Sequence, residues 1–314
     1  MVNTTVCKLC GNPSSDFIFS VKQYDVLACK ECGLFYINPY PEESSAHSKV
    51  KEYSYNDLDI ADAKTNYQAS SMLLERYFER IWDECRNATS LLDVGCGTGN
   101  LLELIHKHSN LRCVGIELNS NRAQYARRVA NCDIYQIPIE DFKSESKFDV
   151  ITIINVLSHI PSFDHLFLSL HSLLAPQGKL IIKVGEMTNS VNKKAIFDWG
   201  IPDHLHFLGL NTIQFLAKKY NFSVIRHERV PLSQELFSKS RWRAEGRSMA
   251  RNIVKKVILR IPFALQVLAS TYDLIYGKEV FSSFIVMSPR DSTPQLFEAC
   301  ISNSSENKKE YRKY

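Results

Sequence analysis

The feature that most constrains the fold is a regular alternation, between residues 90 and 184, of short apolar runs with segments that fit helices. Short apolar runs bounded by polar residues are typical of buried strands. Strands that alternate with helices are joined by crossover connections, which build a parallel sheet with helices on both faces. The strand-like runs are residues 90–94, 111–117, 133–137, 148–155 and 179–184. A helix at 211–220 and further strands at 222–230 and 280–287 bring the predicted sheet to seven strands.

The composition fits a chain with one large core and small appendages. The chain has 314 residues, of which 45% are hydrophobic and 23% charged. Its net charge of +4 is too small to make nucleic acid the default partner. No apolar run approaches the roughly 18 residues of a membrane span, and the N-terminus lacks a basic segment followed by an apolar one. We therefore expect a cytoplasmic protein whose nine cysteines stay reduced.

A glycine-rich loop follows the first of these strands. Residues 91–100 read Leu-Leu-Asp-Val-Gly-Cys-Gly-Thr-Gly-Asn, and a helix is predicted from Thr98. Glycines allow a sharp turn there and let a ligand lie against backbone N–H groups at the helix N-terminus. A dinucleotide fingerprint needs Gly-x-Gly-x-x-Gly, and a P-loop needs Gly-Lys followed by Ser or Thr. The loop matches neither pattern.

With Asp93 two residues before the first glycine, the loop resembles the first motif of class I S-adenosylmethionine-dependent methyltransferases. The resemblance covers residues 70–230 and the last strand, because 148–161 resembles the family's fourth strand with its exit and 175–180 resembles the turn before the fifth. It implies an α/β fold with a Rossmann-like seven-stranded, mostly parallel sheet and helices on both faces. It also implies S-adenosylmethionine as the cofactor.

The resemblance assigns roles to individual residues. In that family the acid of the first motif holds the cofactor's ammonium group, and an acid at the end of the second strand, here Glu117, accepts the ribose hydroxyls. Pro138 stands where the family usually has an acid for the adenine amino group, so Ile139 and Glu140 are expected to border the adenine. The implied cofactor residues are Asp93, Gly95, Cys96, Gly97, Gly99, Glu117, Leu118, Ile139, Glu140 and Asn155.

Two cysteine pairs stand near the N-terminus, Cys7 with Cys10 and Cys29 with Cys32. Two Cys-x-x-Cys pairs separated by eighteen residues fit a four-thiolate zinc ribbon. Four thiolates leave no coordination position for water, so the predicted Zn²⁺ is structural. The expected organisation is a ribbon at 1–45, a linker with an N-terminal helix at 46–85, a methyltransferase domain at 86–290 and a disordered C-terminal tail at 291–314.

The sequence after the second cysteine pair, residues 32–41 with Tyr53 and Tyr55, is similar to the ribbon of bacterial methyltransferases that often modify sugars in polysaccharide or natural-product pathways. A different ribbon-bearing group acts on ribosomal RNA. The resemblance therefore implies methyl transfer to oxygen or carbon of a sugar-like, anionic small molecule, with a ribosomal or transfer RNA methyltransferase as the alternative. A non-catalytic cofactor-binding or scaffolding protein is an alternative of another class.

Methyl transfer to a hydroxyl or an acidic carbon needs a base that removes the acceptor's proton. His159 follows the fourth strand, at the edge where open α/β sheets bind ligands, and His204 and His206 lie in the long loop after the fifth strand. That His-x-His phrase resembles a loop that carries the catalytic histidine in sugar carbon-methylating relatives. We rank His204 first, His206 second and His159 third; a structural role is the competing interpretation for each. DNA is excluded as acceptor, because residues 154–158 lack the Asn/Asp-Pro-Pro-aromatic phrase of base-amino methylation.

A basic helical insert is predicted at 233–278. From 239 to 260 it has eight basic residues against Glu245 alone, and apolar residues occupy the opposite helical face. One interpretation is a solvated basic face whose apolar side packs on the domain or on a second subunit. The other is a surface for an anionic partner, such as a membrane contacted through 239–261, a nucleotide-sugar diphosphate or RNA.

Overall fold

The computed structural model describes residues 6–40, 74, 77–243 and 249–290. The predicted C-terminal tail at 291–314 lies outside the described residues, as does most of the predicted linker at 46–85. Of that linker, residues 77–85 are described and form the end of a helix, as the sequence predicts.

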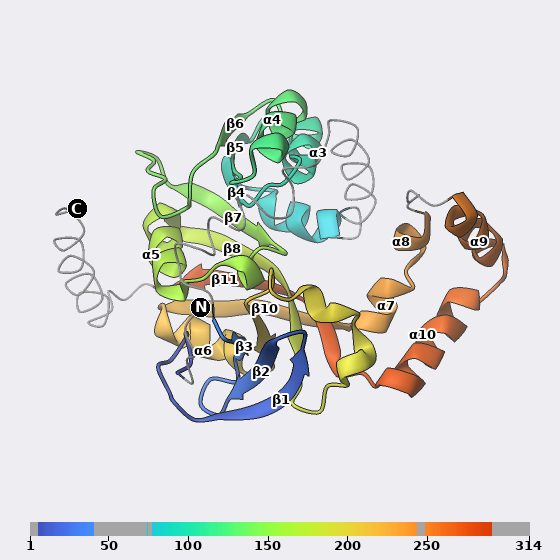
Figure 1. Ribbon diagram of the computed structural model, residues 1–314. Helices are drawn as coiled ribbons and strands as arrows, with labels where there is room; N and C mark the ends of the chain where they lie inside the picture. Colours follow the sequence, from blue (N-terminus) through green and yellow to red (C-terminus); the bar gives the residue numbers. More distant parts are fainter. Residues whose placement is uncertain (1–5, 41–73, 75–76, 244–248, 291–314) are drawn as a thin grey trace.

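A single mixed sheet of eleven strands forms the centre of the described chain (Figure 1). Five parallel strands run in the order β6-β5-β4-β7-β8, and β11 pairs antiparallel with both β8 and β10. The bounds of these strands are β4 Ser90–Val94, β5 Arg112–Ile116, β6 Asp133–Tyr135, β7 Phe148–Ile154, β8 Leu174–Met187, β10 Phe222–Pro231 and β11 Val280–Pro289. All seven strands predicted from the sequence are present. Only β8 differs much from its predicted bounds, because it pairs with β7 from Leu174 onwards and with β11 up to Met187.

Alternating side chains along the central strands build one core on each face of the sheet. Leu91 and Ile181 pack with the helix at 77–85, α3 and α4, whereas Leu92 and Ile182 pack with α5 and α6. The helices are α3 Asn100–His108, α4 Ser120–Val129, α5 Phe163–Leu173 and α6 Thr212–Lys219, and a short 3₁₀ turn, η1 Leu157–His159, follows β7. The predicted two-faced α/β arrangement is therefore present.

Four additional strands make the sheet larger than the seven strands predicted. They are β1 Ser15–Val21, β2 Tyr24–Cys29, β3 Phe35–Asn38 and β9 His206–Gly209. The first three form an antiparallel meander, and β3 pairs with β9. In turn β9 pairs with the last two residues of β8, Glu186 and Met187. The segment after the fifth strand, predicted as a loop, therefore contains a strand that joins the N-terminal meander to the central sheet.

The meander packs closely on the residues around β9. The Ile37 N–H donates to the Leu205 carbonyl at 3.0 Å, and the Lys219 ammonium donates to the Leu9 carbonyl at 2.7 Å. A Cβ on Gly209 would lie 2.1 Å from the carbonyl oxygen of Gly33, so the two backbones touch. The N-terminal unit is thus part of the main body and not a separate appendage.

The insert between β10 and β11 forms a helical arm that projects from the body in Figure 1. Its helices are α7 Leu232–Leu236, α8 Lys239–Arg243, α9 Met249–Arg260 and α10 Ala264–Tyr276. The described basic residues between 239 and 260 lie on α8 and α9, and Arg247 lies outside the described residues. Among the described residues, no helix is both long and apolar enough to cross a bilayer.

Candidate functional site

The glycine loop joins β4 to α3 in a conformation that only glycine adopts readily. Gly95, Gly97 and Gly99 have φ angles of 74°, 57° and 82°, in the left-handed region that is unfavourable for residues with a Cβ. A Cβ on Gly95 would also lie 2.3 Å from a methyl carbon of Val156. The Gly95 and Cys96 N–H groups both donate to the Ile116 carbonyl, at 2.7 and 3.0 Å, which fixes the loop to β5.

Asp93 lies on β4 just before this loop and is 3% exposed. Its Oδ1 accepts a hydrogen bond of 2.7 Å from the Thr152 hydroxyl, and Thr152 is its register partner on β7. Burial raises the pKa of the Asp93 carboxyl group to about 7, although the Thr152 hydrogen bond lowers it. A buried carboxyl group that accepts a hydrogen bond from a neutral hydroxyl is suited to a cationic ligand group.

Glu117 follows β5 and reaches across to the glycine loop. Its Oε2 accepts from the Gly97 N–H at 2.9 Å, and its Oε1 accepts from the Asn119 N–H at 2.8 Å. Burial raises the pKa of Glu117, and its charge in turn raises the pKa of Asp93. The two carboxyl groups are therefore close enough to interact.

The other predicted cofactor residues occupy different environments. The Cys96 thiol is buried, with a pKa well above its usual value because of that burial, and its N–H and carbonyl are bonded to Ile116 and Gly99. Ile139 is buried in the core, whereas Leu118 and Glu140 are half-buried. The structure thus gathers the predicted acids and glycines at one edge and leaves Ile139 mainly as core.

Asn155, the remaining predicted cofactor residue, is exposed at the end of β7 with a φ of 58°. Its Oδ1 accepts from the Lys183 ammonium at 3.0 Å, and that ammonium also contacts Glu235 Oε1 at 3.0 Å and the Tyr77 ring at 4.9 Å. Burial by itself would raise the pKa of Glu235, but the Lys183 ammonium lowers it.

This buried Lys183–Glu235 pair was missed by the sequence analysis. The available signal was a lysine within the apolar strand run 179–184, because a buried lysine needs a partner. Its partner comes from α7 of the insert, which no local pattern connects to β8.

His159 and His204 meet at the same edge of the sheet, with ring centroids 4.7 Å apart. His159 ends the turn after β7, and its Nδ1 donates to the Asp203 carbonyl at 2.9 Å. The His204 Nδ1 donates to the Trp199 carbonyl at 3.0 Å. Because a carbonyl oxygen only accepts, both rings carry their proton on Nδ1, which leaves Nε2 as the basic nitrogen. Burial lowers the pKa of His159, so its ring stays neutral near pH 7.

The predicted loop position of His206 is wrong. It lies on strand β9 and not in a loop, and it is 1% exposed. Its Nε2 donates to the Leu157 carbonyl at 2.7 Å and its ring packs on Phe163, while burial lowers its pKa to about 3. These contacts are those of a core histidine that holds β9 against the turn after β7. Of the three predicted bases His206 is thus the least accessible, whereas His204 and His159 are half-buried and remain candidates.

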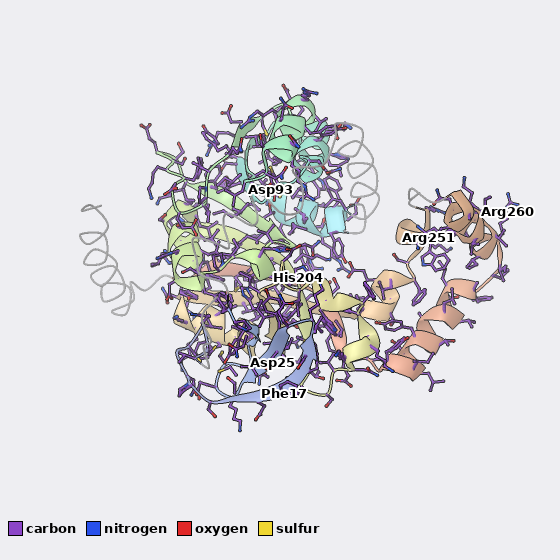
Figure 2. All side chains as sticks on the ribbon, viewed as in Figure 1. Phe17, Asp25, Asp93, His204, Arg251 and Arg260 are labelled. Atoms are coloured by element: carbon purple, nitrogen blue, oxygen red, sulfur yellow. The ribbon has the colours of Figure 1, made fainter. Side chains whose placement is uncertain are left out.

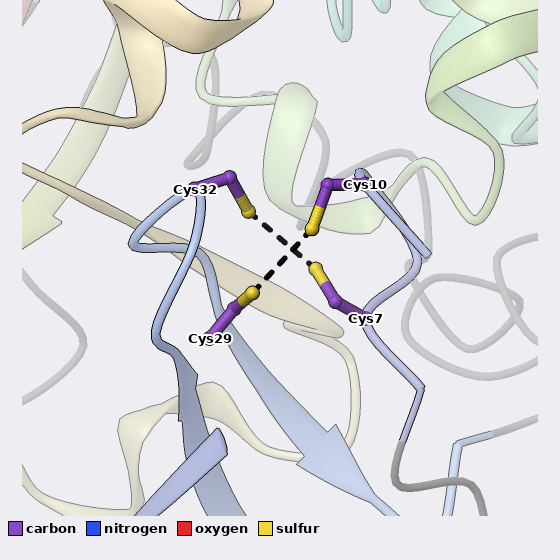
Figure 3. A group of neighbouring side chains, drawn as sticks. All are labelled: Cys7, Cys10, Cys29 and Cys32. Carbon is purple, nitrogen blue, oxygen red and sulfur yellow. Dashed lines mark hydrogen bonds between the residues drawn. The ribbon is translucent and has the colours of Figure 1, made fainter. Parts of the chain in front are cut away.

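The four N-terminal cysteines converge at the end of the meander (Figure 3). The Sγ atoms of Cys7 and Cys32 are 3.5 Å apart, as are those of Cys10 and Cys29, and all four lie within 4.8 Å of one another. Four sulfurs around zinc at about 2.3 Å would be about 3.8 Å apart, so the donor set fits a tetrahedral ion. After each pair, Gly11 or Gly33 turns back with its N–H on the carbonyl of the first cysteine, as in a zinc knuckle.

Comparison with known proteins identifies the domain. Residues 66–227 match the family described as the methyltransferase domain, which is more than half of the chain. The protein therefore belongs to the methyltransferase-domain family, and its sheet has the mixed α/β, Rossmann-like arrangement of that fold.

Individual relatives cover parts of the chain. A ubiquinone biosynthesis O-methyltransferase from Pasteurella multocida is 35% identical over 104 residues, which is 28% of this chain and 43% of that protein. The match spans less than half the length of this relative and of others like it.

Two solved structures share the fold. A phosphoethanolamine N-methyltransferase 2 from Haemonchus contortus superimposes with a TM-score of 0.58 at 16% identity, covering 87% of this chain and 71% of that one. A geranyl diphosphate C-methyltransferase from Streptomyces coelicolor gives a TM-score of 0.51 at 12% identity, covering 69% and 79%. At these identities the likeness concerns the fold.

Proposed function

We propose that the protein is an S-adenosylmethionine-dependent methyltransferase that methylates oxygen or carbon of a sugar-like small molecule. The observation that carries the proposal is the glycine loop with two buried carboxyl groups beside it, Asp93 just before the loop and Glu117 bound to the Gly97 N–H. The Asp93 carboxylate would hold the ammonium group of the cofactor, and the remaining acceptor positions of Glu117 would take the ribose hydroxyls. The glycines of the loop carry no side chain, so the methionine portion could lie directly against the loop backbone.

The base of the proposed reaction is the Nε2 of His159, with His204 as the neighbouring alternative. When bound, the cofactor supplies an activated methyl group on a sulfonium, so the residues of the chain have to align the acceptor and take its proton. The acceptor's proton would move to Nε2 while its oxygen or carbon forms the bond to the methyl carbon and the carbon–sulfonium bond breaks. The carbonyls that hold each Nδ1–H orient the rings and stabilise the imidazolium that results.

The acceptor class rests on the environment of this edge. At the end of β7, Asn155 accepts from the Lys183 ammonium, and that ammonium pairs with Glu235 of α7, so this edge carries polar and charged side chains that suit a polar small molecule. The relatives named above support a small-molecule acceptor, because their names include ubiquinone biosynthesis and geranyl diphosphate. The ribbon resemblance favours a sugar among such acceptors.

The proposal includes one structural zinc ion held by Cys7, Cys10, Cys29 and Cys32. A four-thiolate set favours Zn²⁺ and leaves no position for substrate, so the ion would stabilise the ribbon and take no part in methyl transfer.

Calorimetric titration of the full chain with S-adenosylhomocysteine tests the cofactor site. Glu117→Ala should weaken binding roughly tenfold or more, because a charge-assisted hydrogen bond contributes about 1.5–3 kcal/mol. The matched control is Glu103→Ala, since Glu103 lies on α3 and pairs with the exposed Lys107. Equal affinities for Glu117→Ala and the native protein would refute the assignment.

Methyl transfer from labelled S-adenosylmethionine to a panel of nucleotide sugars tests the acceptor. The proposal is supported if the labelled sugar product accumulates to several molecules per molecule of enzyme. Label in ribosomal or transfer RNA added to the same assay, with none in the sugars, would replace the proposed acceptor by RNA. Cofactor binding with no transfer to either would favour the non-catalytic alternative.

A further inference from the structure

The arm formed by α9 and α10 exposes an unusual amount of aliphatic surface. Of the large hydrophobic side chains that are exposed in the described residues, more than half lie between residues 253 and 275. On α9 they are Ile253, Val254 and Val257, and Ile261 follows the end of that helix; each is 53–55% exposed. On α10, Val267 and Leu274 are 61% and 87% exposed, and Phe263 between the helices is 75% exposed. The apolar side of the insert therefore does not pack on the domain.

The exposed residues of α9 form one stripe. At about 100° per residue, Ile253, Val254 and Val257 fall within an arc of about 100°. The half-buried residues Asn252 and Leu259 lie on the opposite side of this helix, where α8 and α10 pack. The stripe thus points away from the rest of the arm.

Basic residues border this stripe. On the same helical projection, Lys256 and Arg260 lie along one edge and Arg251 along the other. Helix α9 contains four basic residues and no acidic one. In α10 the one charged residue is Asp273. Figure 2 shows Arg251 and Arg260 on the arm, well away from Asp93 and His204.

We propose that the α9–α10 arm is an interfacial anchor that binds the surface of an anionic lipid membrane. An aliphatic stripe flanked by cations on a short helix is suited to lie in the interface plane, with the apolar side chains at the acyl boundary and the cations at the lipid phosphates. The charge selects this partner over a second copy of the chain, because pairing two stripes would bring the basic edges together. The aliphatic composition selects it over RNA, since aliphatic side chains give bases no aromatic ring to stack on.

The inference is independent of the methyl acceptor, because it concerns residues outside the candidate site. It also differs from a membrane span, since each helix of the arm has 12 or 13 residues.

Vesicle co-sedimentation of the full chain tests the anchor, with phosphatidylcholine vesicles and vesicles that contain about 30% phosphatidylglycerol. We expect binding to the anionic vesicles, with weaker binding at high salt, because each basic residue near an anionic surface contributes about fivefold in affinity. The double variant Val257→Glu with Leu274→Glu should bind at least tenfold more weakly. Phe17→Glu, which changes a 61% exposed side chain on β1, should bind like the native protein.

A second pair of variants separates charge from apolar contact. Lys256→Glu with Arg260→Glu should lose anionic-vesicle binding, whereas Arg128→Glu with Lys218→Glu, exposed residues of α4 and α6, makes the same change in net charge and should retain it. Melting temperatures should be unchanged in all of these surface variants. The proposal is overturned if the native protein ignores anionic vesicles or if the arm variants bind them like the native protein. It is also overturned if light scattering shows a dimer that the arm variants lose while they still bind vesicles. The same holds if a gel shift shows RNA binding that these variants lose while they still bind vesicles.

Discussion

The buried carboxyl group of Asp93 should make cofactor affinity depend on pH. Burial raises its pKa to about 7 in the ligand-free protein. A bound ammonium group interacts with the carboxylate and not with the neutral acid, so binding lowers this pKa and releases a proton. Affinity is therefore greatest above pH 7 and is lost as the pH falls through the ligand-free pKa. The ionised fraction falls from about three quarters at pH 7.5 to about 3% at pH 5.5, which corresponds to a rise of about 25-fold in Kd if the bound-state pKa is below 5.5.

Calorimetry with S-adenosylhomocysteine between pH 5.5 and 7.5 measures this effect, and the ligand's amino group stays largely protonated over that interval. Buffers of different ionisation enthalpy report the proton released. Asp93→Asn should bind about tenfold or more weakly at pH 7.5 and show little pH dependence, because the titrating group and its charge are gone. Asp133→Asn, on the exposed edge of β6, should keep the native slope. If the affinity of Asp93→Asn depended on pH as strongly as that of the native protein, the released proton could not be assigned to Asp93. If the affinity of the native protein did not change with pH, the reasoning from burial would be refuted.

Three further predictions concern the base, the metal and the joined sheet. His159→Ala should lower turnover by about 10² to 10⁴ with cofactor affinity and melting temperature little changed; full turnover there and in His204→Ala would remove both rings from the mechanism. Cys29→Ser should release one zinc per chain by metal analysis and increase hydrogen exchange in the ribbon and in β9 alike, so an increase confined to the ribbon would contradict the shared sheet. Gly209→Ala should lower the free energy of unfolding by about 1–3 kcal/mol, because the added Cβ would lie 2.1 Å from the carbonyl oxygen of Gly33. Gly185→Ala, whose Cβ meets nothing closer than 4.0 Å, is its control, and equal losses in the two variants would show that the close approach is unimportant.

The parts of the fold that the sequence predicts are those encoded locally. The strands of the central sheet are apolar runs of strand length, and the glycine loop is contiguous, so each could be located within a few residues. The same holds for the cysteine pairs, whose spacing alone indicated that four thiols would converge.

The parts that the sequence does not predict depend on contacts between distant segments. Strand β9 has four residues and is stabilised by pairing with β3 and with the end of β8, so no local pattern distinguishes it from a loop. That single error also misplaced His206, because a strand position turned its ring into the core. The Lys183–Glu235 pair joins β8 to the insert and required the tertiary fold in the same way.

The pairing of β3 with β9 has a consequence for the order in which the chain folds during synthesis. Hydrogen bonds between the meander and the body join residues 180 and 210 positions apart, from Thr212 to Cys32 and from Lys219 to Leu9. The meander leaves the ribosome first, yet β3 has no partner on its outer edge until β9 has been made. Contacts of such sequence separation form slowly, and an unpaired edge that carries the buried side chains of Phe35, Tyr36 and Ile37 invites aggregation while it waits. Early metal binding by the four cysteines would hold the meander in shape over that interval, so zinc supply during translation, more than in the finished protein, should decide the yield of soluble chain.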